Sequence, residues 1–97
     1  MRLVYLPSTA HDLIWLRTYY TKVFPEGAKK AREEIRRAER LLQDHPFAGE
    51  RFGSDFRELL IPRTPFAMIY RVANDRIEIL EIQDVRRGRR NVTNPPT

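Results

Sequence analysis

The chain has 97 residues, of which 41% are hydrophobic and 32% are charged, and its net charge is +5. This length suits one domain, and this composition is that of a globular protein, which excludes a membrane-spanning chain and an intrinsically disordered one. The absence of cysteine excludes disulfides, zinc–thiolate sites and a thiol nucleophile, and it suits a reducing cytoplasm.

The first predicted elements are a short strand and a helical hairpin. Residues 1–6 form an apolar run that suits a strand and is too short for the core of a signal peptide. Apolar residues at helical spacing over 9–23 predict a first helix, with a stripe of Leu13, Leu16, Tyr20 and Val23. A second helix begins near Pro25, stops at Pro46 and carries a seam of Ala28, Ala31, Ile35, Ala38 and Leu42. Small residues let helices approach closely, so an antiparallel hairpin is expected.

The remaining face of the second helix is densely charged. It comprises Lys29, Lys30, Arg32, Glu33, Glu34, Arg36, Arg37, Glu39 and Arg40. Charges of both signs at helical separations are typical of a solvated face. A face that binds nucleic acid is the alternative.

The second half of the chain predicts a sheet. Residues 46–55 read as a loop with two aromatic anchors, after which the apolar period becomes two and predicts strands at 56–61, 66–72 and 76–85. The order β-α-α-β-β-β indicates an α+β fold, in which a helical hairpin packs on a small antiparallel sheet. The domain is expected to span residues 1–90, followed by a flexible polar tail at 91–97.

Alternation along the predicted strands places arginines among apolar residues. One face of the first of these strands carries Arg57, Leu59, Ile61 and Arg63, and Arg71 projects from the next strand. In the last strand, alternation sets Ile77 and Ile79 opposite Leu80 and Ile82. Two helices cover only one side of a sheet, so the other side is expected to be either an open groove or a surface hidden by the loop and the tail.

Catalytic and metal-binding patterns are sparse. His11 and His45 are isolated and read as surface or capping residues, and Glu78 and Glu81 are expected on opposite faces of a strand, which makes a poor acid–base pair. We predict no metal site and no cofactor. The four arginines at positions 86, 87, 89 and 90 form a cationic segment without acidic residues, which suits either an anionic partner or a solubilising terminus.

Several sequence runs together resemble a known family. They are Phe56-Arg57-Glu58-Leu59-Leu60-Ile61-Pro62-Arg63-Thr64-Pro65-Phe66, Ile69-Tyr70-Arg71-Val72 and Arg76-Ile77-Glu78-Ile79-Leu80-Glu81-Ile82, with Tyr5-Leu6-Pro7, Asp12-Leu13 and His45-Pro46 upstream. In order and spacing they resemble the RelE/ParE superfamily of toxins from bacterial type II toxin–antitoxin modules. The resemblance implies two helices on an antiparallel sheet and a cognate acidic antitoxin, whose flexible tail lies along the toxin as a helix and often adds a strand to its sheet.

The superfamily divides by target. RelE-like members are ribosome-dependent endoribonucleases that cut messenger RNA, whereas ParE-like members poison DNA gyrase. The chain resembles the nuclease pattern at Arg57 and Arg87, but it has Leu59 and Ala67 where a lysine and an arginine stand in that pattern. Thr93 lies near the place of a tyrosine, and Asp84 stands where many relatives have a histidine.

These departures favour the ParE-like subgroup. RNA cleavage needs a base, an acid and a cation that stabilises the phosphate, and arginine does not readily exchange a proton near neutral pH. A ribonuclease in which Arg57 and Arg87 stabilise charge and Asp84 acts as base is the alternative, and a non-enzymatic basic nucleic-acid-binding domain is a third. The residues expected to bind the target or antitoxin are Arg57, Leu59, Ile61, Arg63, Arg71, Arg86, Arg87, Arg89 and Arg90.

Overall fold

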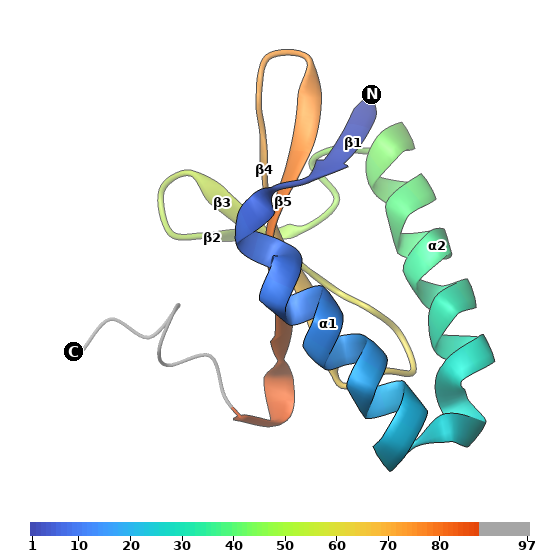
Figure 1. Cartoon of the computed structure of the whole chain (residues 1–97). Helices are drawn as coiled ribbons and strands as arrows, with labels where there is room; N and C mark the ends of the chain where they lie inside the picture. Colours follow the sequence, from blue (N-terminus) through green and yellow to red (C-terminus); the bar gives the residue numbers. More distant parts are fainter. Residues whose placement is uncertain (88–97) are drawn as a thin grey trace.

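The computed structural model describes residues 1–87, in which two helices pack on one side of a five-stranded sheet (Figure 1). The elements are β1 (Arg2–Tyr5), α1 (Ala10–Thr18), α2 (Ala28–Asp44), β2 (Glu50–Phe52), β3 (Phe56–Leu60), β4 (Phe66–Val72) and β5 (Arg76–Asp84). This confirms the α+β class with a helical hairpin on a sheet. Arg89, Arg90, Thr93 and the tail predicted at 91–97 lie outside the described residues.

The sheet is mixed, which the sequence pattern did not indicate. Its strand order is β1-β5-β4-β3-β2, and β1 pairs with β5 in parallel, whereas every other neighbouring pair is antiparallel. The segment predicted as a loop at 46–55 contains β2, an edge strand that pairs Glu50 with Glu58. The Tyr5 hydroxyl also donates to the Glu39 carboxylate at 2.6 Å, which fastens β1 to α2.

The first helix changes geometry near its end. Regular α-helix covers Ala10–Thr18, and a π-helical turn follows at Tyr19–Val23, where the Phe24 N–H donates to the Tyr19 carbonyl at 2.9 Å. Pro25 follows directly and lacks the N–H that would continue the helix. Of the predicted stripe, Leu16 is buried, but Val23, at the end of the π-helical turn, is 67% exposed.

The predicted seam of α2 is confirmed, with one correction on the charged face. Ala31, Ala38 and Leu42 are buried, and the latter two belong to the core cluster. Glu34 was expected in solvent but is only 2% exposed, because it lies one turn before Ala38 on the same side of the helix.

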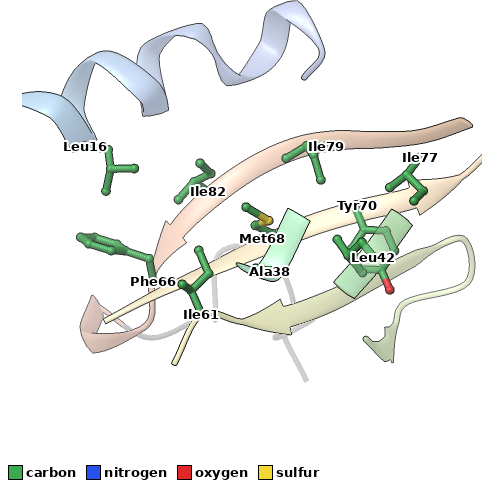
Figure 2. Close-up of a cluster of buried hydrophobic side chains, with 10 residues drawn as sticks. All are labelled: Leu16, Ala38, Leu42, Ile61, Phe66, Met68, Tyr70, Ile77, Ile79 and Ile82. Atoms are coloured by element: carbon green, nitrogen blue, oxygen red, sulfur yellow. The ribbon is translucent and has the colours of Figure 1, made fainter. Parts of the chain in front are cut away.

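The core lies between the hairpin and the sheet (Figure 2). Leu16 of α1 points toward Phe66 and Ile82, while Leu42 of α2 lies beside Tyr70. The full cluster is Leu16, Ala38, Leu42, Ile61, Phe66, Met68, Tyr70, Ile77, Ile79 and Ile82.

A β-bulge in β5 explains why strict alternation fails there. Ile69 pairs with Glu81 and Tyr70 with Ile79, so Leu80 is the extra residue. The bulge returns Ile82 to the core side, together with Ile79. Since paired residues share a face, Glu78 and Glu81 both lie on the outer face, away from the helices. The prediction that Glu78 and Glu81 lie on opposite faces is therefore wrong, and so is the prediction that Ile79 and Ile82 do.

Candidate binding surfaces

An apolar groove lies between α2 and β3. It has a volume of about 300 Å³ and is lined by Glu34, Arg37, Ala38, Leu41, Leu59, Leu60 and Pro62. Leu41 and Leu60 are 41% and 56% exposed, although both are large and apolar. We call this surface the α2/β3 groove. Exposed apolar residues that gather in one groove are typical of a protein-binding surface.

Two arginines beside this groove bind the same buried carboxylate. Glu34 Oε2 accepts hydrogen bonds from Arg63 Nη1 at 2.8 Å and from Arg37 Nη1 at 3.2 Å. The Glu34 side chain is 3% exposed, whereas those of Arg63 and Arg37 are 58% and 62% exposed. The two guanidinium groups therefore remain largely accessible, and together they outweigh the single negative charge that holds them.

Arg63 occupies a tight turn and not a strand face. Its φ of 61° is in the left-handed region, which is uncommon for a residue with a side chain. The turn is closed by a hydrogen bond from the Thr64 N–H to the Ile61 carbonyl at 3.2 Å. Ile61, which follows the end of β3, lies on the helix side with Leu59 as alternation predicts, but it is buried in the core at 1% exposure. It is not available for a partner in this structure.

Arg57 is directed at backbone carbonyls. It lies on the helix side of the sheet, where it is the strand partner of Tyr70. Its side chain donates hydrogen bonds to the carbonyls of Gly49 at 2.8 Å and Phe47 at 3.3 Å. Its guanidinium also lies 5.0 Å from the centroid of the Phe47 ring. These contacts make Arg57 a brace for the segment that leads into β2.

Tyr70 supports the same segment from within the core. Its hydroxyl donates to the Pro46 carbonyl at 2.8 Å and accepts from the Gly49 N–H at 2.9 Å, and burial raises the pKa of this phenol. A side chain at Gly49 would have its Cβ 2.8 Å from the Glu58 carbonyl and from the Tyr70 ring. This close approach accounts for a glycine at that position.

Arg71 and Arg76 bind one carboxylate on the outer face. Glu78 accepts from Arg71 Nε at 2.6 Å and from Arg76 Nε at 2.7 Å. Its side chain is 4% exposed, and these two guanidiniums hold the pKa of the Glu78 carboxyl below its ordinary value of 4.5. The triad fastens the two strands of the β4–β5 hairpin, which projects beyond the other strands (Figure 1).

We expect Glu78→Gln to weaken the fold at neutral pH and to reduce its sensitivity to acid. Because the pKa of Glu78 is lower in the folded chain, its stabilising contribution is present above about pH 4.5 and is lost as the pH falls through the lower, folded-state pKa. Urea unfolding of both proteins from pH 7 to pH 3 would measure this. An unchanged difference in unfolding free energy across that range would contradict the assignment.

Arg86 ties the end of β5 to the first helix. It donates to Asp84 through Nε at 3.0 Å and Nη2 at 2.8 Å, and its guanidinium lies 5.3 Å from the centroid of the Tyr19 ring. The hydrogen bonds to Asp84, and after them a hydrogen bond from Arg86 Nη1 to the Tyr19 hydroxyl, raise the pKa of Arg86. Tyr19 itself packs edge-on against Phe66 of the core. Arg87 follows in the 3₁₀ turn Val85–Arg87.

Two of the three candidate nuclease residues, Arg57 and Asp84, lie far apart in the sheet. Arg57 pairs with Tyr70 and Asp84 pairs with Phe66, on opposite sides of β4. Those partners are four residues apart, which is about 13 Å along a strand. Leu59, paired with Met68, is on the helix side, whereas Ala67 faces the outer side.

Sequence patterns indicate only one of the seven residues that line the α2/β3 groove. Of the residues proposed for binding, only Leu59 lines the groove and Arg63 stands beside it, while Arg37, Leu41 and Leu60 were not proposed. The helical position of Glu34, one turn before Ala38, was the available signal. It places a carboxylate on the buried stripe, where a cation from another element must meet it.

Comparison with known proteins identifies the family. The sequence model of a family described as "ParE toxin of type II toxin-antitoxin system, parDE" matches residues 3–92. The chain belongs to the ParE toxin family. A solved ParE-related structure, described as "Chromosomal ParDE TA system from P. aeruginosa", has 31% sequence identity and a TM-score of 0.67, and the match covers 87% of this chain and 95% of that chain. No curated protein matched.

These findings confirm the predicted RelE/ParE resemblance and its ParE-like subgroup. The ParE family belongs to type II toxin–antitoxin systems, so an antitoxin is the partner that membership implies. Within residues 1–87, no helix of this ParE-family chain has the length and apolarity needed to cross a bilayer.

Proposed function

We propose that this chain arrests growth in the cytoplasm by poisoning DNA gyrase, and that an acidic cognate antitoxin neutralises it. Membership of the ParE family supports a toxin role. The observation that carries the choice of target is the separation of Arg57 from Asp84 across β4, because a single phosphate cannot reach both.

The local contacts of the same residues also disfavour RNA cleavage. Arg57 donates hydrogen bonds to the Phe47 and Gly49 carbonyls, and Asp84 accepts hydrogen bonds from Arg86. On the outer face, Glu50 pairs with Glu58 and Glu81 lies across β4 from them. This row of carboxylates repels RNA phosphates, so this part of the outer face is not a cationic surface for a message. The arginines further along the same face, Arg71 and Arg76, are bound to Glu78.

The α2/β3 groove is the site we propose for the antitoxin. Its apolar lining suits the apolar face of an amphipathic helix, and the accessible guanidiniums of Arg37 and Arg63 suit carboxylates at the edge of that helix. Apolar contact supplies the affinity, and the charges set the orientation and the association rate.

The test of the target uses purified chain that is free of antitoxin. We expect it to inhibit supercoiling by DNA gyrase and to trap cleaved DNA, and we expect prior addition of the antitoxin to abolish both effects. Growth arrest in cells without any effect on gyrase in vitro would reject gyrase as the target.

We expect Asp84→Asn to retain gyrase inhibition and growth arrest, because asparagine keeps a hydrogen-bond acceptor for Arg86 while losing the charge of a general base. Primer extension on translated messages should show no new cuts with either protein. Cuts that appear with the natural chain and vanish with Asp84→Asn would instead support the ribosome-dependent ribonuclease.

A further inference from the structure

The helical hairpin carries a second groove, which the antitoxin site does not use. It lies between α1 and α2, has a volume of about 270 Å³ and is lined by Leu13, Leu16, Arg17, Tyr20, Thr21, Ala28, Ala31, Arg32 and Ile35. We call it the α1/α2 groove. The small side chains of Ala28 and Ala31 leave space that larger residues would fill.

The backbone beside this groove is irregular. Tyr20 and Thr21 lie in the π-helical turn, and the Tyr20 ring packs against Phe24 with centroids 6.1 Å apart. A π-helical turn is rare and is found frequently at functional sites. Here it leaves Phe24 45% exposed next to a groove residue, and Leu13 on the groove wall is 38% exposed. Water-exposed apolar side chains around an apolar groove indicate a partner.

The charges of this groove differ from those of the α2/β3 groove. Its lining includes Arg17 and Arg32 and no carboxylate, whereas the α2/β3 groove has Glu34 between its arginines. Within residues 1–87, neither Arg17 nor Arg32 forms an ion pair. Two unneutralised guanidiniums beside an apolar surface complement a segment that carries apolar residues on one side and carboxylates on the other.

We propose that the α1/α2 groove is the surface that holds the toxin's target protein, through an acidic amphipathic segment of that target. The more apolar α2/β3 groove suits the long-lived antitoxin complex, and the arginine-lined α1/α2 groove suits a shorter contact. This inference rests on the proposed function in one respect, that growth arrest follows from binding a protein target.

Two charge-reversed variants test the proposal. Arg17→Glu/Arg32→Glu alters the groove, and Arg36→Glu/Arg40→Glu alters exposed positions of α2 that line neither groove. Each lowers the net charge by four, from +5 to +1. We expect the groove variant to need at least about tenfold more expressed protein for growth arrest, and to bind the antitoxin as the natural chain does. The control variant should match the natural chain in both assays, and thermal melts should show that both variants fold.

Each outcome decides the proposal. Growth arrest by the groove variant at the natural level would overturn it, and so would joint loss of arrest and antitoxin binding, which would assign the groove to the antitoxin. Loss of binding to duplex DNA, where the natural chain binds it, would make the groove a nucleic-acid site. If the natural chain arrests growth without affecting gyrase and only the groove variant fails to arrest, gyrase is rejected but the surface is supported. A natural chain without effect on growth would overturn both proposals.

Discussion

Leu42→Ala is expected to lower the free energy of unfolding by about 2–5 kcal/mol. Leu42 has no exposed surface and packs from α2 into the core beside Tyr70 (Figure 2). Truncation to alanine removes buried methyl groups and leaves a cavity that the sheet fills only in part. The free energy of unfolding of a domain of this size is roughly 5–10 kcal/mol, so the variant should be close to unfolding at 37 °C. Urea denaturation followed by circular dichroism would measure the change.

Leu41→Ala is the matched control for this prediction. Leu41 is the adjacent residue in α2, but it lines the α2/β3 groove and is 41% exposed. We expect it to change the unfolding free energy by less than about 1 kcal/mol. Equal destabilisation by the two substitutions would mean that Leu41 is packed in the core as Leu42 is, which would contradict this orientation of α2.

Leu60→Glu is expected to weaken antitoxin binding by at least about 2 kcal/mol, which is roughly 30-fold, and to leave growth arrest intact. Leu60 is 56% exposed and contributes to the apolar lining of the α2/β3 groove, so a carboxylate there is tolerated by the free toxin. In the complex the same carboxylate would be buried against an apolar helix, and it would compete with the antitoxin's carboxylates for Arg37 and Arg63. Calorimetric titration with the cognate antitoxin would measure the loss.

Ile14→Glu provides the comparison for the groove. Ile14 is 65% exposed on α1 and does not line the α2/β3 groove. It receives the same change of charge, and we expect its antitoxin affinity to stay within about twofold of the natural value. If Ile14→Glu weakens the antitoxin more than Leu60→Glu does, the proposed antitoxin site is wrong.

The elements that the sequence predicts well are those whose apolar period is long and regular. Alternation over 66–72 defines β4 at its observed bounds, and the seam from Ala28 to Leu42 defines the buried side of α2. In both cases burial of one side of an element against the core imposes the pattern, so the pattern can be read back.

The elements that the sequence does not predict depend on contacts distant in the chain. The three residues of β2 are too few to show a period, and its pairing with β3 exists because Tyr70 and Arg57 hold the preceding segment. The bulge at Leu80 is set by the register with β4, which no local pattern encodes. Alternation assumed across it therefore misplaced Ile82.

In the candidate site, too, some features are predictable from the sequence and others depend on contacts distant in the chain. The sequence indicates an arginine-rich chain, but only the structure distinguishes what each arginine contacts. Arg57 braces backbone carbonyls, Arg71 is held by Glu78, and Arg63 remains accessible beside the α2/β3 groove. The type of residue was thus predictable, whereas its availability for a partner depends on the position of carboxylates and carbonyls from other elements.

The parallel pairing of β1 with β5 bears on how the toxin emerges from the ribosome. Arg2 aligns with Arg76, so β1 cannot pair until the ribosome has synthesised β5, near the end of the chain. At synthesis rates of about 5–20 residues per second, that delay is about 4–15 seconds. A nascent chain interrupted before residue 76 lacks the strand on which both β1 and β4 depend. Translation products that end before β5 should therefore be harmless to the cell, and toxicity should require a chain that extends through Asp84.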